Sequence, residues 1–66
     1  MRYVYLSLRH GNEKLEMFDN LLTALSEAVD DMEFNNAYPI KITDIRENIT
    51  IERAVIIKEW ASKYGD

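Results

Sequence analysis

Apolar and polar positions alternate at the start of the chain. A period of two over residues 2–9 predicts a β-strand. His10, Gly11 and Asn12 then predict a turn. Residues 14–18 are interpreted either as a short return strand or as an extended lead-in to a helix. The predicted first strand places Val4, Leu6 and Leu8 on one face and Tyr3, Tyr5, Ser7 and Arg9 on the other.

Helical spacing of apolar residues follows over residues 20–34. Asp19 is predicted to cap this helix, because its carboxylate can accept hydrogen bonds from the free amides of the first turn. Asn35 and Asn36 are predicted to end it, because asparagine tolerates the left-handed conformation. A second helix is predicted over residues 53–64, with Gly65 as its stop. The two apolar stripes comprise Leu21, Leu22, Leu25, Ala28, Val29 and Met32, and Ile56, Ile57, Trp60, Ala61 and Tyr64.

Two further strands are predicted over residues 38–45 and 49–52, separated by a turn. Pro39 has no backbone donor, so it must lie at a strand start or face an open edge. The order β-(β)-α-β-β-α predicts an α+β fold, in which both helices pack on one face of an antiparallel three- or four-stranded sheet. The strand residues expected to meet the helices are Val4, Leu6, Leu8, Ile40, Ile42, Ile49 and Ile51.

The 66-residue length predicts a single domain over residues 1–66. The absence of cysteine excludes disulfides and thiolate metal sites, and a single histidine disfavours zinc. No apolar run approaches the roughly 20 residues of a membrane span, so we expect a cytoplasmic protein without membrane contact. Because so small a core barely offsets the entropy of folding, a homodimer is also considered.

The net charge of −4 is concentrated in the first half of the chain. Residues 1–33 carry seven acidic and three basic residues, whereas residues 34–66 carry five of each. This balance disfavours direct nucleic-acid binding, which requires a basic surface. Four acids gather near the negative end of the first helix dipole, an arrangement that costs stability. They are interpreted as a docking patch for a basic partner or as a solvated face, and comprise Glu27, Asp30, Asp31 and Glu33.

Tyr3 and Tyr5 are predicted to stand on the uncovered face of the sheet. Three interpretations remain open for them: a protein interface, in which tyrosine is enriched, ordinary cross-strand pairing, or stacking of single-stranded nucleic-acid bases, which the overall charge disfavours. Trp60 and Tyr64 are interpreted as core and core edge. His10, in a turn, has no nucleophile and orienting partner specified by the spacing, so we expect a surface side chain.

The sequence therefore predicts no enzyme, no cofactor and no metal site, since it contains no P-loop, nucleophile elbow or dinucleotide motif. The leading hypothesis is a small acidic protein-interaction module that binds and modulates a larger protein with a basic surface. Glu27, Asp30, Asp31 and Glu33 would steer the encounter, and Tyr3 and Tyr5 would supply contact area. One alternative is a structural homodimer, joined through the open sheet face or through the edge beside Pro39. A second, less favoured alternative is a single-stranded nucleic-acid binder.

Overall fold

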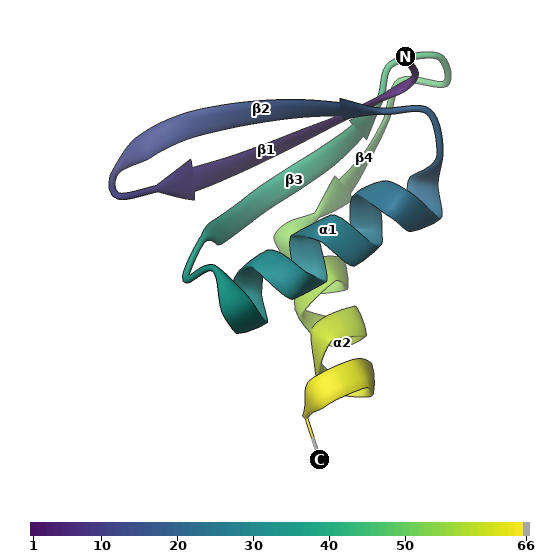
Figure 1. Ribbon diagram of the computed structural model, residues 1–66. Coiled ribbons are helices and arrows are strands. Elements are labelled where there is room, and N and C mark those ends of the chain that lie inside the picture. Colours follow the sequence, from purple (N-terminus) through teal and green to yellow (C-terminus); the bar gives the residue numbers. More distant parts are fainter. Residues whose placement is uncertain (66) are drawn as a thin grey trace.

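A tight turn folds the first strand back on the second in the computed structural model, which describes residues 1–65 (Figure 1). Strand β1 (Tyr3–Arg9) pairs antiparallel with β2 (Asn12–Phe18), and Arg9 lies opposite Asn12. His10 and Gly11 between them have φ angles of 53° and 80°. Two successive positive φ angles are the signature of a type I′ turn, whose twist matches that of the strands. Residues 14–18 are therefore strand rather than a lead-in.

Helix α1 (Leu21–Phe34) begins one residue later than predicted. The cap is Asn20, whose side chain accepts hydrogen bonds from the amides of Leu22 at 2.8 Å and Thr23 at 3.4 Å. The prediction of Asp19 as the cap is wrong, because β2 remains paired through Phe18 and Asp19 is needed for the bend between strand and helix. At the other end, the left-handed position is Asn36, with φ of 52°.

Strands β3 (Tyr38–Asp44) and β4 (Ile49–Glu52) complete the sheet, and α2 (Arg53–Tyr64) follows β4 directly. All neighbouring strands are antiparallel, in the order β2-β1-β3-β4. Both helices pack on the same face: α1 runs beneath the sheet, and α2 descends from the β4 side (Figure 1). The predicted α+β class, element order and one-sided helix layer are confirmed.

The predicted orientation of β1 is wrong. Tyr5 and Ser7 are fully buried between the sheet and the helices, and Tyr3 packs against the same core. Because side chains alternate along a strand, Val4, Leu6 and Leu8 lie on the uncovered face. A tyrosine can enter a core when its hydroxyl finds a partner, so alternation alone could not decide which face the helices would cover.

A β-bulge in β3 changes which residues share a face. Leu6 pairs with Lys41 but Ser7 pairs with Pro39, so Ile40 is the extra residue. Pro39 and Ile42 consequently both face the helices, where both are buried. Pro39 is tolerated because β4 pairs only with Lys41–Asp44, and no described strand lies beside it on that side.

The core lies between the central strands and the two helices. Leu21, Leu25, Ile51, Trp60 and Tyr64 pack around it as predicted. The prediction that Leu22 and Ile49 lie inside is wrong, since they are 76% and 56% exposed. The fully or almost fully buried apolar residues are Tyr5, Ala24, Ala28, Val29, Ile42 and Ile56.

Candidate protein-interaction surface

The face of the sheet opposite the helices carries a continuous apolar strip, and we call this surface the open face. Val4 lies opposite Met17, and Leu6 lies opposite Leu15, across the β1–β2 pair. Neighbouring positions on the same face add Leu8 and, across from it in β3, Tyr38. Polar side chains lie around the strip at Glu13, Lys41, Thr43, Thr50 and Glu52.

The strip is more exposed than an ordinary core-facing strand surface. Leu15 is 65% exposed and Met17 is 48% exposed, and both helices pack on the opposite face of the sheet (Figure 1). At one margin of the strip, the Arg53 guanidinium at the start of α2 lies against the Tyr38 ring. Contiguous apolar surface on a small domain is typical of an interaction site, whereas single scattered apolar residues need no explanation. The open face is thus the strongest candidate contact surface among residues 1–65.

Tyr3 and Tyr5, the tyrosines predicted to supply contact area, lie on the helix side of the sheet. The Tyr5 hydroxyl donates a 2.8 Å hydrogen bond to Asp31 on α1, and the ring has no exposed surface. Burial, with the added effect of the Asp31 carboxylate, raises the pKa of Tyr5. Tyr3 packs against the core and lies 5.2 Å beneath the Arg2 guanidinium. The prediction that these rings line the uncovered face is wrong, because Val4, Leu6 and Leu8 take that face.

Asp31 is also inside the molecule rather than in an exposed acidic patch. Its carboxylate accepts three hydrogen bonds of 2.8 Å, from Tyr5, Arg9 and Asn35, and its side chain is fully buried. A buried carboxylate requires such partners, since an unpaired charge in the interior is very costly. Asp31 therefore ties α1 to β1 and to its own C-terminal cap.

Two further acids of the predicted patch join the helices to each other. Asp30 accepts a 2.7 Å hydrogen bond from the Tyr64 hydroxyl and a 3.1 Å bond from Lys63. These two donors, with Tyr64 the larger influence, lower the pKa of Asp30. Glu33 accepts a 3.0 Å bond from the indole nitrogen of Trp60. The acids thus make contacts within the chain that sequence reasoning did not predict.

Glu27, the fourth acid, lies in a carboxylate cluster with Glu16 and Asp31, whose oxygens are within 4.8 Å of one another. Burial and these two neighbouring carboxylates raise the pKa of Glu27. The Arg9 guanidinium lies among them, 2.8 Å from Asp31 and 3.6 Å from Glu16. Arg9 therefore already supplies a compensating positive charge at this cluster.

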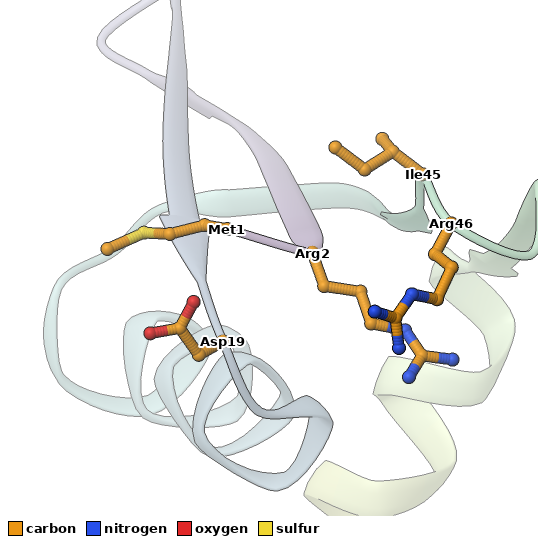
Figure 2. A pocket seen from close by; sticks show the side chains of 5 residues that line it. All are labelled: Met1, Arg2, Asp19, Ile45 and Arg46. Carbon is orange, nitrogen blue, oxygen red and sulfur yellow. The ribbon is translucent and has the colours of Figure 1, made fainter.

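A shallow cavity of about 530 Å³ opens at the end of the sheet where the chain starts (Figure 2). Arg2 and Arg46 extend toward the same side of it, and Asp19 lies on the other. Arg2 is held by two hydrogen bonds to Asp44, of 2.9 and 2.8 Å. His10 lies at the opposite end of β1, in the hairpin turn, and is exposed as predicted. Among the described residues, the cavity thus brings together no nucleophile and histidine.

The edge beside Pro39, the second predicted dimer contact, lies close to the start of α2. The Arg53 guanidinium stacks 3.9 Å from the centre of the Tyr38 ring, at the point where α2 begins. Pro39 is itself buried.

Comparison with known proteins adds no relationship: no family model, curated protein or solved structure matches the chain. Among residues 1–65, neither helix has the length and apolar character needed to cross a bilayer.

Proposed function

We propose that the chain is a protein-interaction module that binds a larger protein through its open face and modulates that protein by occupying part of its surface. The observation that carries the proposal is the apolar strip centred on Leu6 and Leu15, which the helices leave uncovered. Burying apolar surface is the main driving force of protein association.

The size of the open face favours a reversible complex. Three strands of seven residues and one of four, about 4.8 Å apart with a rise of about 3.3 Å per residue, give a face of roughly 400 Å². A partner that covers it would bury roughly 800 Å² in total, counting both surfaces. That area is at the low end of specific interfaces, where transient regulatory contacts are found. A modulating role fits such a contact better than a permanent assembly does.

The charge of the chain favours a partner with basic residues around an apolar patch. The net charge is −4, and Glu13 and Glu52 lie at opposite sides of the strip. Complementary charges at a rim speed encounter and select the partner, while the apolar centre holds the complex. Glu27, Asp30, Asp31 and Glu33 contribute to the overall field rather than forming the contact itself.

The test is affinity capture from a lysate of the source organism with three forms of the chain. Leu6→Glu places a charge at the centre of the open face, on an interior strand. Leu22→Glu makes the same change on α1, where Leu22 is 76% exposed and away from the sheet. Circular dichroism establishes that each variant is folded before use.

The proposal expects a protein that is retained by the wild-type chain and by Leu22→Glu but lost with Leu6→Glu. A partner retained by Leu6→Glu and lost with Leu22→Glu would move the contact to the helical side and refute the proposal. Retention of no protein by the wild-type chain would also count against it.

A further inference from the structure

Strand β2 is an outer edge of the sheet, and its backbone polar groups are unpaired on one side. The Phe18 carbonyl accepts a 3.2 Å hydrogen bond from the Arg2 amide, so it points toward β1. Backbone direction alternates along an antiparallel strand, so the amides and carbonyls of Glu13, Leu15 and Met17 point outward. No other described element lies beyond this edge (Figure 1). A seven-residue open edge is a template for pairing with another strand.

The sequence of β2 is complementary to itself about a twofold axis at Leu15. Antiparallel pairing centred there places Leu15 opposite its own copy, with outward-pointing backbone groups on both strands. Lys14 of each copy then lies directly opposite Glu16 of the other. Directly opposite side chains of opposite charge stabilise a strand pair.

Neighbouring pairing registers that keep each side chain on the same face of the sheet lose this match of opposite charges. Pairing centred on Glu16 places two glutamates opposite each other, and pairing centred on Lys14 places two lysines opposite each other. Like charges in those positions are destabilising. The charges of β2 therefore select one register of self-pairing and disfavour the adjacent ones.

We infer that two copies of this chain pair through β2, in the antiparallel register centred on Leu15, to form one continuous eight-stranded sheet. Glu13, Leu15 and Met17 would form roughly six backbone hydrogen bonds across the twofold axis. The helices leave this edge open, because α1 packs against one face of β1, β2 and β3, and α2 packs toward β3 and β4 (Figure 1). The two open faces would become neighbours, with Leu15 of both copies at the seam.

This inference uses the strand edge and does not depend on the proposed partner contact. Lys14 and Glu16 point toward the helix side of the sheet, since they alternate with Leu15 and Met17. Changing their charges therefore leaves the side chains of the open face in place. Conversely, Leu6 lies on an interior strand, so Leu6→Glu leaves the backbone of the β2 edge unaltered.

Sedimentation equilibrium of the purified chain and two charge variants tests the pairing. In a self-dimer, Lys14→Glu puts two glutamates opposite each other, and Glu16→Lys puts two lysines opposite each other. Each variant alone should dimerise about tenfold more weakly than the wild type, or worse. An equimolar mixture of the two should form a mixed dimer, because residue 14 of each copy then lies opposite a residue 16 of the other sign. Lys58→Glu, an exposed charge reversal on α2, is the control and should dimerise like the wild type.

Three results would overturn the inference. The first is a wild-type chain that stays monomeric at about 100 μM, the range in which so small an interface should form. The second is a failure of the mixed variants to recover dimer although both remain folded by circular dichroism. The third is a wild-type dimer that Leu6→Glu disrupts and Lys14→Glu does not, which would indicate pairing through the open face.

Discussion

Replacement of Asp31 by alanine should remove a large fraction of this protein's stability. The change leaves the Tyr5 hydroxyl, the Arg9 guanidinium and the Asn35 amide without their shared acceptor. Removing one partner of a buried ion pair costs about 3–5 kcal/mol. Since Arg9 is partly exposed, we take the lower end, about 3 kcal/mol. A domain of this length has a free energy of unfolding of roughly 3–10 kcal/mol, at about 0.05–0.15 kcal/mol per residue.

The assay is urea unfolding followed by far-ultraviolet circular dichroism and by fluorescence of Trp60, the single tryptophan. A loss of about 3 kcal/mol should also lower Tm by roughly 15 °C in so small a domain. The matched control is Asp30→Ala, one residue earlier, which removes a carboxylate that is 40% exposed and should cost less. Equal, small losses for the two variants would refute the internal role of Asp31 and restore the exposed acidic patch predicted from sequence.

Three other predictions concern single contacts. Hydrogen bonding to Arg2 lowers the pKa of Asp44 to about 2, below its value in the unfolded chain. The stability from this pair is therefore present at neutral pH and is lost as the pH falls from about 4 toward 2. The urea midpoint should fall less over this pH range in Arg2→Gln than in the wild type. Burial and the neighbouring carboxylates raise the pKa of Glu27, so its charge destabilises the fold as pH rises through its pKa. Glu27→Gln should therefore raise Tm at pH 7. A gain in Tm that persists below about pH 3, where Glu27 is uncharged, would contradict the role of this charge. In the hairpin turn, Gly11 has φ of 80°, so Gly11→Ala should lower the free energy of unfolding by about 1 kcal/mol. His10→Asn should leave the free energy of unfolding equal or raise it, because asparagine is favoured at this position of the turn. The same urea assay measures both variants.

Element order and most boundaries can be predicted from the sequence because local physics determines them. The period-two stretches, the helical stripe and the asparagines after residue 34 each act over a few residues. The second helix and the end of the strand before it have the bounds that the pattern predicts. The helix cap is misplaced by one residue, since Asp19 and Asn20 are both good caps and strand pairing through Phe18 decides between them.

The two faces of the sheet could not be assigned from alternation. Val4, Leu6 and Leu8 alternate with Tyr3 and Tyr5, and a tyrosine enters a core when its hydroxyl finds a partner, so either set could have formed the core. The Tyr5 hydroxyl finds its partner in Asp31 on α1, 26 positions away in the sequence. No local pattern contains such a contact. The bulge at Ile40 likewise arises from pairing between strands distant in sequence.

A signal for the position of Asp31 was nevertheless present. Asp31 lies seven residues after Ala24 and three after Ala28, so all three share one stripe of α1. The two alanines are fully buried and allow a close approach to the sheet. An aspartate that continues such a stripe should be interpreted as a buried acceptor before it is assigned to a docking patch.

The most direct test of the open face as a protein contact is methyl nuclear magnetic resonance of the labelled chain, titrated with the protein that it captures. The methyl groups on the two faces of the molecule report independently. If the account is correct, the signals of Leu6, Leu15 and Met17 shift or broaden on binding, and those of Leu22 and Ile56 stay in place. Shifts at Leu22 without change at Leu6 and Leu15 would contradict it and place the contact on the helices.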